Sequence, residues 1–139
     1  MERLFGQHEH GVDQKGRVIL PAKFRPYYAE RGFLTKHRGG CLALWTPAMF
    51  EKHMGGLAED QDENSIRRNL ARVFAAGTEE VEVDRQGRLP IAAYLRSFAQ
   101  LDGAVLVNGA IDRVELWNPQ VWQQKMAATE ARLLNDEDD

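Results

Sequence analysis

Short apolar runs separated by polar turns occur in the same order in the two halves of the chain. The first half has such runs at 5–12, 17–20, 33–35 and 41–45, and the second at 77–83, at 88–91 in register with 17–20, and at 105–107 and 114–117. Their length and their content of β-branched residues favour strands. Both halves then reach a Trp-x-Pro sequence, where a helix is expected to begin. The order predicts a β-turn-β-α-β-turn-β unit that is present twice.

An Asp-x-x-Gly-Arg sequence lies at the centre of each unit, once from Asp13 to Arg17 and once from Asp84 to Arg88. An Asp side chain can accept hydrogen bonds from backbone N–H groups, and Gly adopts the positive φ that a tight turn requires. Each sequence therefore predicts a turn, with Arg pairing to Asp across it or across an interface. The predicted turn residues are Asp13, Gly16, Asp84 and Gly87.

A short helix and a hairpin are expected after each turn. Pro21 pre-sets the φ of a first helical turn, so residues 22–28 are predicted to form a short amphipathic helix. The hairpin turn is assigned to Gly39-Gly40 in the first copy and to Asn108-Gly109 in the second, since Asn-Gly is a strong hairpin signal. Pro90 stands one position earlier than Pro21 in the shared register, so the second junction is expected to be built differently.

Three longer helices are predicted outside these turns and strands. They cover 47–57, ending at Gly55-Gly56, then 64–76, and finally 119–134. The middle one carries a single apolar stripe of Ile66, Leu70, Val73 and Phe74. The predicted divisions are 5–57 for the first repeat, 58–76 for the linking helix, 77–134 for the second repeat and 135–139 for an acidic tail expected to be disordered. The fold class is therefore mixed α+β and β-rich, with two pseudo-symmetric units and peripheral helices.

The size of the units argues for packing against each other and against other copies. Units of about fifty residues are marginal in isolation. Trp45, Trp117 and the apolar stripe exceed what a chain of this size is expected to bury. We therefore expect a closed homo-oligomer with heterologous contacts.

Composition sets the class of protein. The 139 residues are 43 % hydrophobic and 28 % charged, which is ordinary for a soluble globular protein. A single cysteine, Cys41, excludes an intramolecular disulfide and favours a cytosolic setting. The first residues lack the apolar stretch of a signal peptide, and no run approaches the length of a membrane span. We expect no membrane association.

The net charge of −3 hides a basic region. Between Asp13 and Arg38 stand seven basic residues against two acidic ones, whereas the last four residues are all acidic. Such a region is compatible with phosphate contact and equally with a solvated surface. The basic residues assigned to DNA binding are Lys15, Arg17, Lys23, Arg25, Arg85 and Arg88.

Catalytic and metal sites are not indicated. The chain has no nucleophile elbow, no phosphate-binding loop and no HExxH sequence, so we expect neither an enzyme nor a small-molecule substrate. His8 and His10 share one strand face, but no recognised ligand spacing follows, so an exposed strand face is expected there rather than a metal site. No cofactor is expected. The structural and the DNA-binding interpretation of the Asp–Arg pairs both remain open on composition alone.

The doubled signature resembles the two DxxxR motifs of the MraZ family, here Asp13–Arg17 and Asp84–Arg88, with Phe5-Gly6-Gln7 matching the family's opening. Each copy is similar to the swapped-hairpin fold of SpoVT/AbrB-type regulators. The resemblance covers about Phe5 to Leu134 and implies a bacterial, sequence-specific DNA-binding regulator that represses its own division and cell-wall gene cluster. It also implies binding to repeated promoter boxes as a ring-shaped oligomer, in the cytoplasm and associated with the nucleoid.

One alternative and one finer hypothesis remain. The alternative is a ring-forming scaffold that binds protein partners and touches DNA incidentally. The finer hypothesis assigns DNA contact mainly to the first copy, because Lys15 and Lys23 have no obvious structural partner in the sequence. The second copy would then mainly build the core and the ring.

Overall fold

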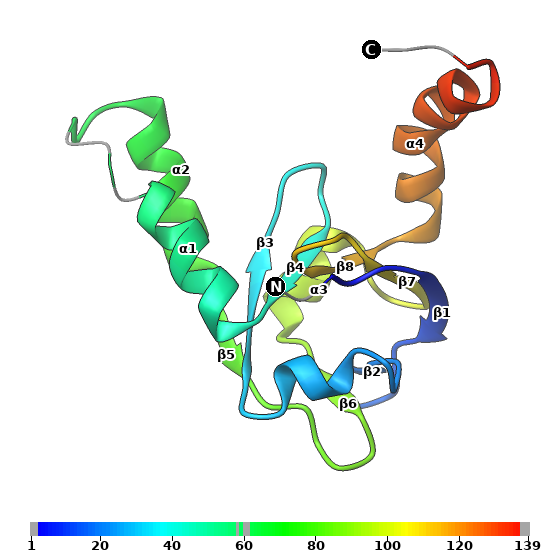
Figure 1. The fold of residues 1–139 in the computed structure, drawn as a ribbon. Helices are drawn as coiled ribbons and strands as arrows, with labels where there is room; N and C mark the ends of the chain where they lie inside the picture. Colours follow the sequence, from blue (N-terminus) through cyan, green and yellow to red (C-terminus); the bar gives the residue numbers. More distant parts are fainter. Residues whose placement is uncertain (1–2, 58, 60–61, 137–139) are drawn as a thin grey trace.

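The computed structural model describes residues 3–57, 59 and 62–136. Within these residues eight strands form two sheets, and every paired strand runs antiparallel to its neighbour (Figure 1). The strands are β1 (Gln7–Gly11), β2 (Arg17–Ile19), β3 (Gly32–Lys36), β4 (Leu42–Trp45), β5 (Glu79–Val81), β6 (Arg88–Pro90), β7 (Ala104–Gly109) and β8 (Val114–Trp117). The larger sheet has the order β1-β7-β8-β4-β3-β5, and β2 pairs with β6 in a separate two-stranded ribbon.

The two copies exchange strands. The hairpin β3–β4 belongs to the first copy and β7–β8 to the second, and the hairpins meet along β4 and β8. Strand β1 of the first copy pairs with β7 of the second, whereas β5 of the second copy pairs with β3 of the first. The predicted pair of pseudo-symmetric swapped units, mixed α+β in class, is therefore confirmed.

The main core lies between the large sheet and the β2–β6 ribbon. Val18 and Leu89 face each other across the ribbon, and each is only 1 % exposed. Leu34, Val105 and Leu116 of the sheet are fully buried in the same cluster. The burial of both ribbon strands against one apolar cluster fixes the position of the turns that flank them.

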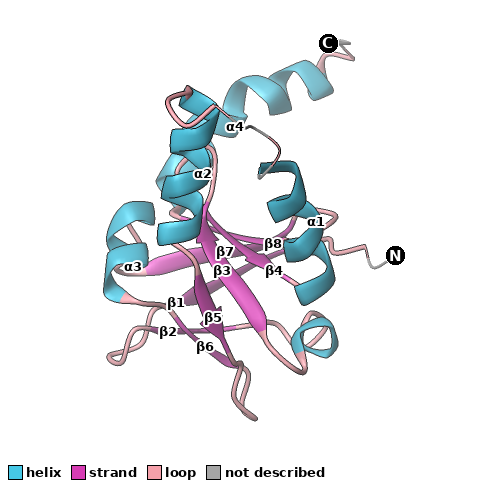
Figure 2. Cartoon of the chain, turned by 90° about the vertical axis from the view of Figure 1, so that its left-hand side faces the viewer, coloured by secondary structure: helices cyan, strands magenta, loops and turns pink. Residues whose placement is uncertain are grey.

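The described residues also form four α-helices and one 3-10 helix, and Figure 2 shows the long helices outside the strands. They are α1 (Pro47–Leu57), α2 (Ile66–Ala76), α3 (Ala93–Ala99), α4 (Pro119–Leu134) and η1 (Arg25–Tyr28). Helix α1 packs Phe50 against Phe33 and Phe74, while the first half of α4 packs around Trp117. The three predicted long helices are confirmed, although α1 continues through Gly55-Gly56 to Leu57.

The helix predicted over 22–28 is wrong, because this segment is not an α-helix. Its hydrogen bonds from Phe24, Arg25 and Tyr27 all reach back three residues, and only 25–28 form a 3-10 helix. Pro26 has no N–H to donate to Ala22, so the α-helical ladder cannot form across this segment. The second copy has no proline at the matching place and forms the true helix α3. The two copies therefore differ after the ribbon, and the difference is explained by Pro26 rather than by the offset between Pro21 and Pro90 on which the expectation rested.

The predicted Asn108-Gly109 turn is also wrong. Both residues lie inside β7, where Asn108 pairs with Gln7 and Glu115. The turn falls instead on 110–113, with Ala110 N–H donating to the Arg113 carbonyl and Ile111 at a φ of 76°. Pairing with β1 on the other side extends β7 beyond the point that the short-range signal indicated.

The two tryptophans are already buried within this chain. Trp45 and Trp117 are 2 % and 3 % exposed within this chain, which contradicts their use in the argument for an oligomer. The stripe on α2 is different, because Ile66, Leu70 and Val73 are 80 %, 47 % and 54 % exposed. Only Phe74 of that stripe is buried.

Candidate nucleic-acid interface

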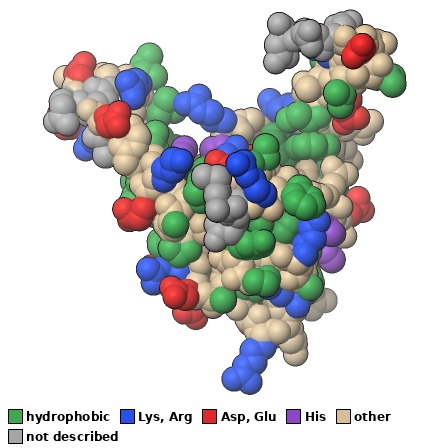
Figure 3. Space-filling model, viewed as in Figure 1, with side chains coloured by type: hydrophobic (Ala, Val, Ile, Leu, Met, Phe, Trp, Pro, Cys, Tyr) green, Lys and Arg blue, Asp and Glu red, His purple; other side chains and the backbone are tan. Residues whose placement is uncertain are grey.

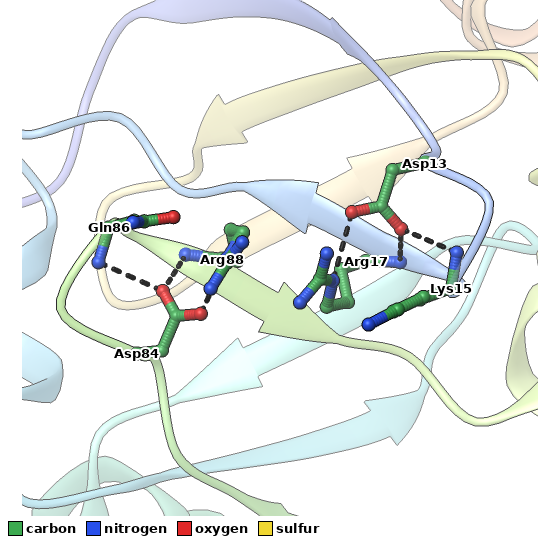
Figure 4. A network of polar contacts seen from close by, with 6 residues as sticks. All are labelled: Asp13, Lys15, Arg17, Asp84, Gln86 and Arg88. Carbon is green, nitrogen blue, oxygen red and sulfur yellow. Dashed lines mark hydrogen bonds and ion pairs between the residues drawn. The ribbon is translucent and has the colours of Figure 1, made fainter.

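The two Asp-x-x-Gly-Arg sequences form the same turn at the two ends of the β2–β6 ribbon (Figure 4). One carboxylate oxygen of Asp13 accepts the N–H groups of Lys15 and Arg17, both at 2.9 Å, and the other accepts Arg17 Nε at 2.9 Å. Backbone bonds from Asp13 N–H to the Arg17 carbonyl and from Gly16 N–H to the Asp13 carbonyl close the loop. The predicted structural role of the Asp–Arg pair is present in full.

The second turn repeats this arrangement. Asp84 accepts the N–H groups of Gln86 and Arg88 at 2.9 Å and the Arg88 Nε at 2.5 Å. The N–H donated by Arg17 lowers the pKa of Asp13, and the N–H donated by Arg88 lowers that of Asp84, with the guanidinium bonds adding to the effect. Both carboxylates are therefore ionised wherever nucleic acid would be bound near neutral pH.

Each turn is packed by an arginine from the other copy. The Arg25 guanidinium lies over Gly87 and donates through Nε to the Leu20 carbonyl at 2.8 Å. Arg96 lies over Gly16 and donates to the Ile91 carbonyl. A Cβ at either glycine would collide with that guanidinium, and both glycines have a positive φ, 76° at Gly16 and 81° at Gly87.

Backbone hydrogen bonds connect the same pair of turns. The Leu20 N–H donates to the Gly87 carbonyl at 2.7 Å, and the Ile91 N–H donates to the Gly16 carbonyl at 3.0 Å. The two turns are consequently one rigid unit rather than two independent loops. Arg96 was not among the predicted site residues, yet its match to Arg25 in the sequence repeat was the signal that could have identified it.

The ribbon presents one face to solvent. Val18 and Leu89 point into the core, and strand alternation puts Arg17 and Arg88 on the opposite face, where Figure 4 shows both guanidinium groups over the ribbon. Their side chains are 25 % and 34 % exposed. Each uses Nε for its own aspartate, and in the part of the chain that the structure describes their terminal nitrogens make no hydrogen bond. These nitrogens are available to an acceptor outside the chain.

The remaining predicted basic residues fall into two groups. Lys15 and Arg85 are exposed on the two turns, one on each. Lys23 has a structural partner after all, because its Nζ lies 4.9 Å from the Phe5 ring centroid and 5.4 Å from that of Phe24. The structure therefore brings Lys15, Arg17, Arg85 and Arg88 to the ribbon and its turns, while Arg25 is half-buried beneath them and Lys23 lies against aromatic rings.

His8 and His10 lie on the half-buried face of β1 rather than on an exposed one. The His8 ring packs edge-on against Phe24 at 5.7 Å between centroids. Among the described residues no group of His, Cys, Asp and Glu is arranged to hold a metal ion. Within the same residues, no helix has the length and apolar content needed to cross a bilayer.

Comparison with known proteins gives a consistent result. The family model of the MraZ protein, described as antitoxin-like, matches twice, at residues 4–73 and 74–139. A protein named "Transcriptional regulator MraZ" from Nocardioides sp. is 38 % identical over 130 residues, which cover 94 % of this chain and 90 % of that protein. Proteins of the same name from Saccharopolyspora erythraea and Caldanaerobacter subterraneus are 42 % and 38 % identical, over 86 % and 91 % of this chain and 84 % and 89 % of theirs.

Proposed function

The chain belongs to the MraZ family, and we propose that it is a DNA-binding transcriptional regulator whose β2–β6 ribbon and flanking turns contact the double helix. Relatives that cover nearly the whole chain carry the name of a transcriptional regulator, which supports a non-enzymatic role. The single structural observation behind the proposal is that both Asp–Arg turns lie on one solvent-facing ribbon.

The shape of the ribbon suits this role. The major groove of B-DNA admits a two-stranded antiparallel ribbon, and several β-ribbon regulators use it in this way. Arg17 and Arg88 would reach into the groove with their free terminal nitrogens, while their aspartates hold the guanidinium planes in place. An orientation fixed before binding lowers the entropic cost of forming each contact.

The charge of the surface also suits it. Lys15, Arg17, Arg85 and Arg88 supply four positive charges and the two aspartates two negative ones, a formal net of +2. One such surface makes few phosphate contacts, so its affinity alone would be low at physiological salt. Several copies held together would bind successive boxes at a high effective concentration.

The finer parts of the proposal follow from the family. We propose that the chain represses its own division and cell-wall gene cluster, that it binds repeated promoter boxes as a closed ring, and that it works in the cytoplasm in association with the nucleoid. Contact is assigned to both copies, because the ribbon takes one strand and one turn from each. Arg25 is assigned an indirect role through the turn that it packs, and Lys23 a peripheral one.

The test is a binding titration with the chain's own upstream promoter region and a scrambled duplex of equal length, at several salt concentrations. Lys15→Ala and Arg85→Ala should each weaken binding and lower the salt slope by about 0.9 for each phosphate that is no longer neutralised. Lys125→Ala removes the same charge from an exposed position on α4 and should change neither quantity. Equal effects of Lys15→Ala and Lys125→Ala would remove the ribbon from the proposal.

The scaffold alternative predicts a different result in the same titration. A ring that touches DNA incidentally would bind the promoter and the scrambled duplex equally, and the loss of one ribbon charge would weaken both to the same extent. Discrimination between the two duplexes that Arg17→Gln abolishes, in a variant that retains the far-ultraviolet circular dichroism of the parent, would support the regulator.

A further inference from the structure

Two half-buried arginines beneath the turns carry charges that no carboxylate neutralises. Arg25 lies over Gly87, and Arg96 lies over Gly16. Among the residues that the structure describes, neither guanidinium forms an ion pair with an aspartate or a glutamate. A half-buried cation loses part of its hydration, so an unpaired one is expected where an anion is bound.

Arg25 closes a contact between the two copies. The Leu20 N–H donates to the Gly87 carbonyl, and the Leu20 carbonyl accepts from Nε of Arg25, whose guanidinium covers the same glycine. Leu20 and Arg25 belong to the first copy, whereas Gly87 belongs to the turn of the second. The position of the second turn is therefore fixed by the segment that follows β2.

Arg96 makes the reverse contact in the same form. The Ile91 N–H donates to the Gly16 carbonyl, and the Ile91 carbonyl accepts from the guanidinium of Arg96, which covers Gly16. Ile91 and Arg96 belong to the second copy, whereas Gly16 belongs to the first turn. Each turn is thus held by the copy to which it does not belong.

The aspartates cannot supply this positioning. Within the described residues, the side chains of Asp13 and Asp84 accept hydrogen bonds only from their own turns, so they set the shape of each turn and not its place on the ribbon. A guanidinium is planar and can pack flat on a glycine while it donates to a carbonyl, which an ammonium group cannot do. The two arginines therefore determine where Lys15 and Arg85 are presented.

The charge of these arginines adds to that of the surface. In Figure 1 the ribbon and its turns form the lower end of the molecule, and Figure 3 shows Lys or Arg side chains projecting there. Arg25 and Arg96 raise the formal net charge of the ribbon and its turns from +2 to +4. Because a phosphate at either turn would lie close to one of these cations, they should strengthen its binding without direct contact.

We propose that Arg25 and Arg96 are positioning residues for DNA that act across the two copies. Arg96 holds the first turn, and Arg25 the second, in the orientation that contacts phosphate, and each adds its unpaired charge beneath that turn. The inference rests on the proposed contact between the ribbon and DNA. It goes further, because it makes each half of the bound site depend on a residue of the other copy.

Hydrogen exchange of the free full-length chain, followed by mass spectrometry, tests the positioning without DNA. Arg96→Gln should speed exchange of the amides in 13–17 about fivefold, the factor for one lost hydrogen bond, and leave 84–88 at the parent's rates. Arg25→Gln should do the reverse. Circular dichroism checks that each variant is folded. Lysine at either position keeps the charge and the apolar stem without the planar group, and should give the same crossed pattern to a smaller extent.

Ethylation interference with the promoter duplex then locates the phosphates that each turn contacts. Lys15→Ala and Arg85→Ala change only the turn surfaces, so each should abolish interference at one group of phosphates and assign that group to its turn. Arg96→Gln should remove the same interference as Lys15→Ala. Arg25→Gln should remove the same interference as Arg85→Ala. Arg67→Gln, at an exposed position on α2, is the matched control and should alter neither measurement.

The possible results separate the inference from the function on which it rests. A turn loosened by the arginine of its own copy would contradict the crossed action, and equal loosening of both turns by either variant would reduce the arginines to general stabilisers of the fold. Interference that Lys15→Ala removes and Arg96→Gln leaves intact would refute the positioning role while the proposed function stands. Interference that neither Lys15→Ala nor Arg85→Ala changes would refute the ribbon as the DNA interface, and the inference with it.

Discussion

Acidification should destabilise the fold through His37 well before it protonates the turn aspartates. Burial of the ring beside α1, with Arg113 as the second cause, lowers the pKa of His37 from 6.5 to about 4. The unfolded chain takes up a proton near pH 6.5, whereas the folded chain keeps the ring neutral down to about pH 4. Within that interval the unfolded state holds one more proton, so the free energy of unfolding falls as the pH is lowered.

The size of the effect follows from the shift. Each pKa unit is worth about 1.36 kcal/mol, and at about pH 5 the linkage relation gives a loss of about 2 kcal/mol relative to about pH 8. The ring is half-buried rather than fully enclosed, and solvent screening reduces the expected loss to about 1 to 2 kcal/mol. Such a loss is a substantial part of the stability of a small domain.

Urea unfolding at fixed protein concentration, repeated from about pH 8 to about pH 4.5, measures this dependence. His37→Gln removes the titrating group while its backbone N–H can still donate to the Cys41 carbonyl, so the variant should show a flatter curve over the same range. The pKa of His53 is lowered in the same direction by burial, so some slope should remain in that variant. Parallel curves for the parent and His37→Gln would refute the reasoning.

Three further predictions concern other sites. Gly87→Ala should destabilise the fold in urea by about 1 kcal/mol more than Gly40→Ala, because both glycines have a positive φ but only Gly87 lies under the Arg25 guanidinium; equal midpoints would contradict this. Cys41 should react with iodoacetamide only after unfolding, since burial raises its pKa to about 12; rapid labelling of the native chain would show that the thiol is accessible. Asp84 loses its stabilising effect as the pH falls through its lowered pKa, below the usual 3.8, so Asp84→Asn should flatten the dependence of the unfolding free energy on pH in that acid range and leave its slope near neutral pH unchanged; a change of slope near neutral pH would count against this.

The repeat made most of the fold predictable. Because Asp13 matched Asp84 and Gly16 matched Gly87, one turn could be deduced twice, and both turns form as their chemistry requires. The long helix over 119–134 followed from its proline and its apolar spacing. Signals of this kind depend only on residues that are neighbours in sequence. They can therefore be recognised without knowledge of the tertiary contacts.

The errors arose where contacts between segments distant in sequence determine the local structure. Asn108-Gly109 has the composition of a hairpin turn, but pairing with β1 on its free edge holds both residues in a strand. Trp45 and Trp117 appeared too large for a chain of this size, yet α1 and α4 cover them. Lys23 appeared to have no partner because its contacts with the Phe5 and Phe24 rings depend on how the fold orients these side chains.

The candidate site was predicted by residue type more successfully than by role. Arg17 and Arg88 were assigned both to turns and to DNA, and the structure shows the turn contacts, whereas the DNA contacts stay a prediction. The packing of each turn by an arginine of the other copy could not be deduced, because it depends on the strand exchange. Sequence matching of Arg25 with Arg96 marked the positions without indicating what they contact.

The strand exchange has a consequence for how the chain is made. Strand β1 is among the first segments to leave the ribosome, but its partner β7 is not complete until residue 109 has been synthesised. At about 5–20 residues per second, the first strand waits on the order of 5 to 20 s without its only partner in the sheet. Nascent chains arrested before β7 should therefore be digested by protease at β1, and chains arrested with the whole sequence outside the exit tunnel should resist; protection of the shorter chains would show that the first copy folds alone. We therefore expect that the two halves cannot fold one at a time during synthesis, and that the first half must be kept from aggregating until the second has been made.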